Sequence, residues 1–437
     1  MRRDNVRITV ILLGLVCSLS ATLAVRAQAA FTAISNSRHF SASNYCIYPD
    51  SVEPAETPVP GGKKPFYISH YGRHGSRYLS NRKGYDIPVA ILSRADSLGK
   101  LTATGQEVLH ELRLILADSE GRWGDLTGLG KKQQRDIARR MIRHYPEVFE
   151  GPVHIDARST TVPRCILSMG AATQQMVVMN PQLQVTLQAS HRDMWYMNYQ
   201  DQMLRSLVDS PSCKRAYDEF CKPRKRNPRL MEVLFNDTAY VNQHVDQAWL
   251  NYYLIKTAMV QQNTKMGERS QLINLFSYEE IHQFWQCENV WWYISCGPAP
   301  HSGGVQPYGQ RFLLRKIISD ADSCLQHKRP GAQLRFGHET VLLPLTCLLG
   351  INGYDTQIAD LEHLEDSGWW ACLVFPMASN IQLVFYRRNP HDKDVLVKVL
   401  LNERETRLPL PDDMAPYYRW SDFRQYYLKK LDAYEKQ

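Results

Sequence analysis

The chain has 437 residues, of which 52 are lysine or arginine and 44 are aspartate or glutamate, so its formal net charge is +8. A chain of this length can bury a large core and divide into two structural units. The mild positive balance suits an anionic small molecule as a partner and does not call for nucleic acid.

The first 29 residues have the pattern of an export signal. Basic side chains at Arg2 and Arg3 precede an apolar run at residues 8–19, and small residues end at Ala29. The run is too short to span a membrane, so no stable membrane span is expected. Cys17 could carry a lipid anchor, but the residue before it is bulky for such a site. We expect cleavage after Ala29 and a soluble protein that is exported, either to a periplasm or by secretion.

The first predicted strand, residues 66–70, leads into Arg73-His74-Gly75-Ser76-Arg77. Arginine forks bind phosphate oxygens through bidentate, charge-assisted hydrogen bonds, and a neutral imidazole is a competent nucleophile toward phosphorus. Glycine beside the histidine lets the backbone approach a ligand closely. The motif therefore predicts a phosphate site, with a solvated basic turn as the plain alternative.

Helices and strands alternate along most of the chain. We predict helices at 106–116, 130–144, 162–179, 341–349 and 420–434, and further strands at 153–156, 183–188, 333–336, 381–386 and 395–401. Residues 194–292 have helical spacing, many aromatic side chains and no convincing strand. The pattern predicts an α/β sheet domain, residues 30–190 and 300–437, interrupted by a mostly helical cap at 191–299.

A second group of polar residues, His338-Glu339, follows the predicted strand at 333–336. In α/β folds ligands bind at this edge of the sheet, so the pair could meet the motif at residue 73. A histidine there can donate to a phosphate, and a carboxylic acid can protonate a leaving alkoxide. The alternative for Glu339 is ordinary helix capping.

Arg164 is a third candidate cation, because it lies in the first turn of the helix predicted from residue 162. A guanidinium and the positive end of a helix would reinforce each other against a phosphate dianion. Arg158 is a rival that periodicity does not exclude, and either residue could simply be a surface arginine.

Nine cysteines remain after residue 29, and some should pair in an oxidising compartment. The simplest pairings join sequence neighbours, Cys213 with Cys221 and Cys287 with Cys296, although the sequence leaves the pairing open. No Cys-x-x-Cys or His-Glu-x-x-His spacing occurs, so we expect no metal site.

Four elements together resemble the histidine acid phosphatase branch of the histidine phosphatases. They are Arg-His-Gly-x-Arg at 73–77, Leu-Thr-x-x-Gly-x-x-Gln at 126–133, Arg-Cys-x-x-Ser at 164–168 and Gly-His-acid-Thr at 337–340. The arginine-cysteine form and the stretch Asp193-Met194-x-x-Met197 with Asp201 are similar to the multiple inositol-polyphosphate phosphatases in particular. The resemblance implies a phosphoglycerate-mutase-like α/β domain.

The same resemblance implies a two-step transfer without cofactor or metal. His74 attacks phosphorus and becomes phosphohistidine, while Glu339 protonates the departing alcohol and later helps to activate water. The phosphoryl oxygens are held by Arg73, Arg77, Arg164 and His338. The family usually has His-Asp or His-Ala-Glu here, and Glu339 at the aspartate position reaches one methylene further, so it could act on a differently placed oxygen or with another pH optimum.

A substrate with several phosphates needs more positive charge than one phosphate pocket. Arg192 and the basic segment that includes Lys222 and Arg224 could hold the other phosphates of an inositol hexakisphosphate, or that segment could be a solvated loop. The main hypothesis is an exported inositol-polyphosphate phosphatase of the phytase type. A broad-specificity acid or sugar phosphatase is the alternative, followed by a phosphate-binding protein without turnover. The sequence carries no signal of an oligomeric state.

Overall fold

The computed structural model describes residues 32, 34, 36, 38–52, 57–327 and 331–436. The predicted export signal, residues 1–29, and the lipid-anchor candidate Cys17 lie outside the described residues. Among the residues that the structure describes, no helix combines the length and the apolar character needed to cross a membrane.

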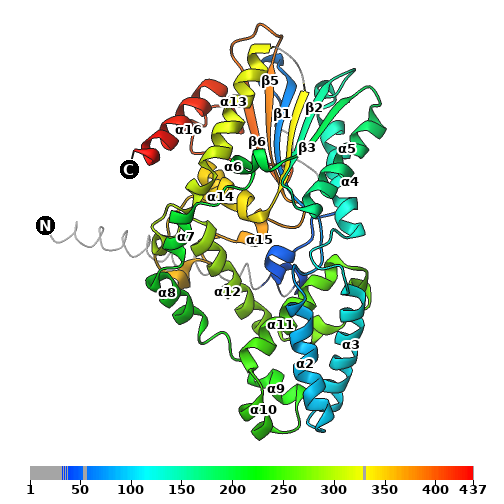
Figure 1. The fold of residues 1–437 in the computed structure, drawn as a ribbon. Helices are drawn as coiled ribbons and strands as arrows, with labels where there is room; N and C mark the ends of the chain where they lie inside the picture. Colours follow the sequence, from blue (N-terminus) through cyan, green and yellow to red (C-terminus); the bar gives the residue numbers. More distant parts are fainter. Residues whose placement is uncertain are drawn as a thin grey trace, which may run out of the picture.

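The described strands form one mixed sheet with the order β3-β2-β4-β1-β5-β6-β7, and β8 pairs with β6 (Figure 1). β1 to β4 run parallel to one another, whereas β5 is antiparallel to β1 and β6 is antiparallel to β5. The strands are β1 (Lys64–Arg73), β2 (His154–Ser159), β3 (Gln184–Ala189), β4 (Gly331–Gly337), β5 (Asn380–Arg387), β6 (Leu396–Leu401), β7 (Arg404–Glu405) and β8 (Tyr417–Arg419).

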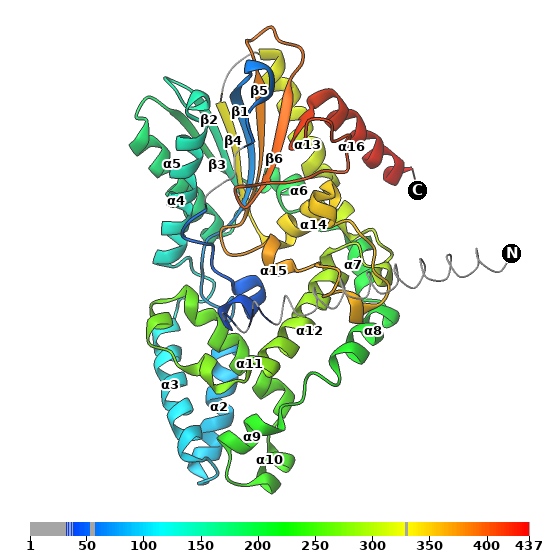
Figure 2. The ribbon, with the colours of Figure 1, turned by 180° about the vertical axis from the view of Figure 1, so that it is seen from behind.

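Helices cover both faces of the sheet. In chain order they are α2 (Lys83–Ser97), α3 (Ala103–Ser119), α4 (Gly128–His144), α5 (Pro163–Met179), α6 (Met194–Met197), α7 (Gln202–Val208), α8 (Pro211–Cys221), α9 (Pro228–Leu234), α10 (Thr238–His244), α11 (Gln247–Val260), α12 (Tyr278–Cys296), α13 (Arg311–His327), α14 (Glu339–Leu349), α15 (Ala371–Val374) and α16 (Trp420–Glu435). Helices α4 and α5 lie on one face, and α13, α14 and α16 on the other (Figures 1 and 2). Each side has its own apolar core, with Ile155 and Met169 in the first and Ile317 and Leu342 in the second.

A separate helical part lies beyond the carboxyl end of the parallel strands (Figure 2). Its core joins α2 and α3 to α9, α11 and α12 through residues such as Leu92, Leu109, Leu234 and Leu254. The segment between β3 and β4 is therefore helical, as predicted, but α2 and α3 pack with it although they precede β2 in the chain. The division at residues 191–299 stays a prediction.

Local signals explain where several helices begin. The Thr127 hydroxyl accepts a hydrogen bond from the Gly130 amide at the start of α4, and Ser277 with Glu280 forms a capping box at the start of α12. Each of the eleven strands and helices predicted by residue range has a counterpart in the structure. Helices α2 and α13 were not predicted; α2 has no side-chain N-cap and contains Pro88, which weakens its signal.

The two predicted disulfides are wrong. The four cysteines of these two pairs are free thiols. Cys213 and Cys221 lie on α8, and Cys287 and Cys296 lie on α12, so each pair is separated by more than two turns of one helix. At a rise of about 1.5 Å per residue the members are about 12 Å apart or more, well beyond the span of a disulfide.

Candidate active site

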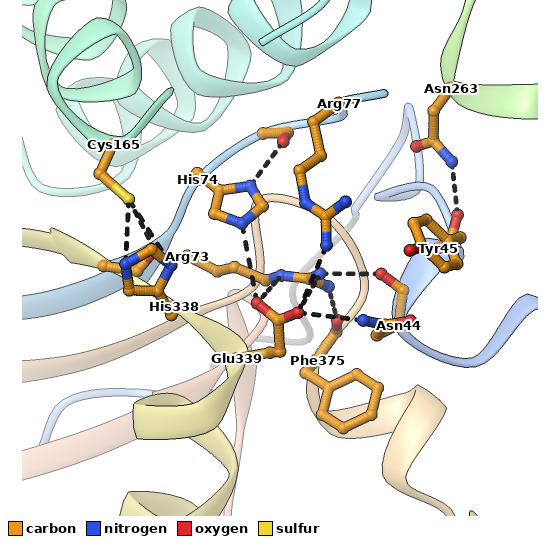
Figure 3. Close-up of polar contacts among 12 residues, drawn as sticks. Asn44, Tyr45, Arg73, His74, Arg77, Cys165, Asn263, His338, Glu339 and Phe375 are labelled. Carbon is orange, nitrogen blue, oxygen red and sulfur yellow. Dashed lines mark hydrogen bonds and ion pairs between the residues drawn. The ribbon is translucent and has the colours of Figure 1, made fainter. Parts of the chain in front are cut away.

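The two motifs from distant parts of the sequence meet at the carboxyl ends of β1 and β4. The register of these parallel strands places Arg73 beside Gly337. The backbone amide of His74 then donates to the Gly337 carbonyl at 3.0 Å, and the imidazole rings of His74 and His338 lie 5.7 Å apart between centroids. Figure 3 shows both histidines and Glu339 pointing into one space.

Close packing against α4 holds the turn after β1. A Cβ on Gly75 would lie 2.3 Å from the backbone oxygen of Gly130, so only glycine fits at residue 75. The Ser168 hydroxyl accepts from the Gly75 amide at 3.1 Å, and the Gln133 side chain accepts from the Ser76 amide at 2.9 Å. The segments at 126–133 and 164–168 therefore fix the backbone on both sides of His74.

His74 has a free nitrogen for chemistry. Its side chain is fully buried, and Nδ1–H donates to the Gly75 carbonyl at 2.9 Å, which leaves the lone pair on Nε2. Within the described part of the chain, Nε2 is buried without a hydrogen-bond partner and lies 3.7 Å from a Glu339 oxygen. Burial, reinforced by the charge of Arg73, holds the pKa of His74 well below its usual range, so the ring is neutral near pH 7.

Glu339 faces the edge of the Arg73 guanidinium (Figure 3). Nε and Nη2 of Arg73 each lie 3.1 Å from one carboxylate oxygen, and Nη2 of Arg77 lies 3.8 Å away. The amide of Asn44 donates to the same carboxylate at 3.0 Å. Burial raises the pKa of Glu339, but the neighbouring positive charges, that of Arg73 above all, outweigh it and hold the pKa well below the usual range.

Arg77 and Arg164 supply further positive charge. In the described structure both have a buried Nε without a hydrogen-bond partner. Burial and the charge of Arg77 lower the pKa of Arg164, and Arg164 in turn depresses the pKa of His74, so the two guanidinium groups act on one space. The rival residue Arg158 instead forms ion pairs with Asp156 and Asp193, both at 3.1 Å.

His338 completes the set of polar groups around this space. Its ring lies 3.4 Å from the Thr160 hydroxyl and 3.8 Å from the Cys165 sulfur. Burial lowers the pKa of His338 to about 4, against the opposing effect of Glu339, so this ring is neutral as well. A neutral imidazole can still donate one hydrogen bond to an anion.

One group of side chains could also hold a metal ion. His74, His338 and Glu339 offer ligand atoms that all lie within 4.8 Å of one another. The guanidinium groups of Arg73 and Arg77 border the same space and repel a divalent cation. With these buried arginines around it, the site suits an anion better than a metal.

The three candidate residues of the cap have other neighbours. The Arg224 guanidinium binds the Glu362 carboxylate at 2.6 Å, Lys222 is exposed, and the Arg192 side chain is 71% exposed beside Asp193. No contact described for these residues joins them to the groups around His74. Their role in binding a substrate stays a prediction.

Sequence reasoning missed the segment before β1. Residues 38–45 form a 3-10 turn that brings Asn44 and Tyr45 to the site (Figure 3). The Tyr45 ring lies 5.2 Å from the Arg77 guanidinium carbon, and Asn263 links the Tyr45 carbonyl to the Ser76 hydroxyl. This segment contains no motif, and its contacts with Glu339 and Asn263 each span more than two hundred residues, so no local signal reveals it.

Comparisons with known proteins agree with this geometry. The family model described as histidine phosphatase superfamily (branch 2) matches residues 72–402. The multiple inositol polyphosphate phosphatase of Bifidobacterium longum in complex with inositol hexasulfate has a TM-score of 0.72 and 17% identity, over 88% of this chain and 96% of that chain. Its complex with phosphate gives 0.70 and 16%, over 90% and 98%. The phytase from D. castellii gives 0.62 and 14%, over 90% and 85%.

No curated protein sequence matches the chain. The structural similarities, at such low identity, show a shared fold and confirm the predicted α/β architecture.

Proposed function

Because the chain belongs to branch 2 of the histidine phosphatase superfamily, and is thus an enzyme of the histidine acid phosphatase type, we propose that it hydrolyses inositol polyphosphates through a phosphohistidine on His74. One observation carries the mechanism: three buried nitrogens, His74 Nε2, Arg77 Nε and Arg164 Nε, have no hydrogen-bond partner in the described structure. Buried polar atoms are rarely left unpaired, so three of them on residues of one pocket favour a polar binding partner there. Two cationic donors beside a nucleophilic nitrogen fit a phosphoryl group.

In the first step, the Nε2 lone pair of His74 attacks phosphorus as the bond from phosphorus to the ester oxygen breaks. The electron pair of that bond goes to the departing oxygen, which takes a proton from Glu339. The hydrogen bond from Nδ1–H to the Gly75 carbonyl stabilises the positive charge that develops on the ring. The arginines and His338 hold the phosphoryl oxygens, and positioning with electrostatic stabilisation is most of what phosphoryl transfer requires.

In the second step, Glu339 accepts a proton from water while the water oxygen attacks phosphorus. The bond between phosphorus and Nε2 breaks, its electron pair returns to His74, and inorganic phosphate leaves. Glu339 has to be protonated for the first step although the neighbouring arginines depress its pKa. The charge of the substrate phosphate favours protonation of Glu339, because an anion near a carboxylate raises the pKa of that carboxylate.

One finding supports inositol polyphosphates as the substrate class. The Bifidobacterium longum enzyme with a similar fold is a multiple inositol polyphosphate phosphatase, in complex with inositol hexasulfate. Lys256, which lies 5.4 Å from the Tyr45 ring, is paired with the Glu288 carboxylate at 2.7 Å and adds no net charge to the pocket. The pattern of residues 1–29 adds the proposal that the enzyme is exported.

The test is to trap the intermediate and compare substrates. Brief reaction with labelled phytate should give an acid-labile protein label that is absent in His74→Ala, and phytate should be turned over faster than glucose 1-phosphate or a nitrophenyl ester. A chelator should leave the rate unchanged. No His74-dependent label would refute the covalent mechanism, and a preference for the simple esters would refute the substrate class while leaving the enzyme class intact.

A further inference from the structure

We propose that Asn44 is a positioning residue that orients the proton donor Glu339. The inference rests on the proposed function and adds a residue from a segment that none of the recognised motifs contains. It starts from the hydrogen bond of 3.0 Å between Asn44 Nδ2 and Glu339 Oε1, which joins residues 295 apart in the sequence (Figure 3).

Asn44 holds both partners of the buried ion pair. Its side-chain amide donates to Glu339, while its backbone carbonyl accepts from Nη2 of Arg73 at 2.8 Å. Arg73 in turn binds both oxygens of Glu339 at 3.1 Å. The three residues form a closed ring of contacts, and each is at least nine-tenths buried. The carboxylate plane and its distance from His74 are therefore fixed from two sides.

The orientation of the Asn44 amide follows from its surroundings. With the amide reversed, its oxygen would face the Glu339 carboxylate, so Nδ2 has to be the group that points there. Within the described structure the Asn44 oxygen has no hydrogen-bond partner, although it is buried. The Asn44 oxygen is thus left without a hydrogen bond, while the amide nitrogen donates to the Glu339 carboxylate.

The backbone before Asn44 is also held in an unusual conformation. Ser43 has φ 52° and ψ −121°, in the region where a residue with a Cβ is disfavoured. Such conformations persist where the surrounding structure imposes them, and they are common at functional sites. Here the conformation puts a kink into the 3-10 segment at residues 38–45, directly before Asn44.

A misplaced donor has a recognisable kinetic effect. An alkyl ester such as phytate or glycerol 2-phosphate needs protonation of its leaving oxygen, whereas nitrophenolate leaves without it. In Asn44→Leu, which keeps the volume but removes the amide, kcat/KM for glycerol 2-phosphate should fall by about tenfold to a hundredfold. The kcat/KM for nitrophenyl phosphate reports phosphoryl transfer to His74 and not the later hydrolysis, so it should change by less than about threefold, and Glu339→Gln should show the same contrast in kcat/KM in a stronger form.

Asn44→Asp gives a second, independent readout. It is isosteric and replaces the donor with a carboxylate beside Glu339, which raises the pKa of Glu339 by like-charge repulsion. Glu339 must be protonated to donate its proton. The pH at which kcat for the alkyl ester falls on the alkaline side should therefore rise by about one unit. A residue whose side chain does not face the Glu339 carboxylate would not cause this shift.

Several outcomes would overturn the inference. Equal losses for both esters in Asn44→Leu, or no such pH shift in Asn44→Asp, would assign Asn44 to structure alone. If Asn44→Leu does not fold, judged by its thermal transition, the pH shift in Asn44→Asp decides. The proposed function fails separately, through absence of a His74-dependent label in the unaltered enzyme.

Discussion

Binding of sulfate at the active site should be accompanied by the uptake of a proton from solvent. In the structure Glu339 is ionised, because the charges of Arg73 and its neighbours hold its pKa well below the usual range. A tetrahedral dianion placed against His74 Nε2 comes close to the same carboxylate, since Nε2 and the nearer Glu339 oxygen are only 3.7 Å apart. The anion and the carboxylate then share the guanidinium groups.

The size of the effect follows from Coulomb's law. At about 4 Å and an effective dielectric constant of about 20, each unit of added charge changes the energy of the carboxylate by about 4 kcal/mol, or about three pKa units. Sulfate carries two charges, and the arginines offset part of them. The pKa of Glu339 should therefore rise strongly, and sulfate binding at an assay pH of about 5 should be accompanied by proton uptake.

Isothermal titration calorimetry measures this uptake directly. The binding enthalpy is recorded in two buffers of different ionisation enthalpy at one pH, and its slope against that enthalpy counts the protons. Sulfate has no protonation step of its own in this range, so the proton must come to the protein. Glu339→Gln should bind sulfate with little uptake. An absence of uptake in the unaltered enzyme, or equal uptake in the variant, would refute the reasoning.

Further predictions concern stability and pH. Glu339→Gln leaves the buried arginines uncompensated and should cost about 3–5 kcal/mol of unfolding free energy at pH 7. Because the pKa of Glu339 is depressed in the folded state, this stabilisation is present above the unfolded value near 4.5 and is lost as the pH falls through the folded pKa. Urea titrations at several pH values would show the loss. Equal stabilities of the unaltered protein and Glu339→Gln at pH 7 would contradict this prediction. Gly75→Ala should abolish activity and cost about 1–3 kcal/mol through overlap with the α4 backbone, whereas Gly170→Ala, whose Cβ meets nothing within 4 Å, should not. Ser168→Ala removes the acceptor of the Gly75 amide and should lower the free energy of unfolding by about 1–3 kcal/mol. An unchanged midpoint of urea unfolding would contradict that role. The pKa of His74 lies well below 6.5, so kcat/KM for a nitrophenyl ester should fall on the acid side only well below pH 6.5, where the ring becomes protonated. A fall at or above pH 6.5 that is due to His74 would show that the ring is solvated.

The sequence was sufficient to predict the site residues that lie at the ends of strands. Arg73 to Arg77 and His338-Glu339 each follow an apolar strand, and parallel strands bring such ends to one edge of a sheet. The same reasoning could not choose between Arg158 and Arg164, because Arg158 lies at the end of β2 and Arg164 follows it closely at the start of α5. The choice depends on Asp156 and Asp193, whose carboxylates engage Arg158 only in the folded chain.

Other features depend on contacts that no local pattern encodes. Asn44 reaches Glu339 across almost the whole chain, and the turn that carries it has no motif. The cysteine pairing was predicted wrongly because sequence proximity was taken for proximity in space, whereas Cys213 and Cys221 lie along one helix. The contact of Arg224 with the Glu362 carboxylate is likewise distant in sequence, and the role of Arg224 in substrate binding stays a prediction.

The pairing of β1 with β4 also determines when activity can arise during synthesis. The two strands supply the nucleophile and the acid, and Arg73 and Glu339 are 266 positions apart in the chain. A nascent chain that ends before residue 339 contains a complete arginine-histidine motif but cannot transfer a phosphoryl group. Contacts of such long range form late and slow folding. The appearance of turnover in a refolding experiment would therefore report the closure of the centre of the sheet, while helices of local origin would already have formed.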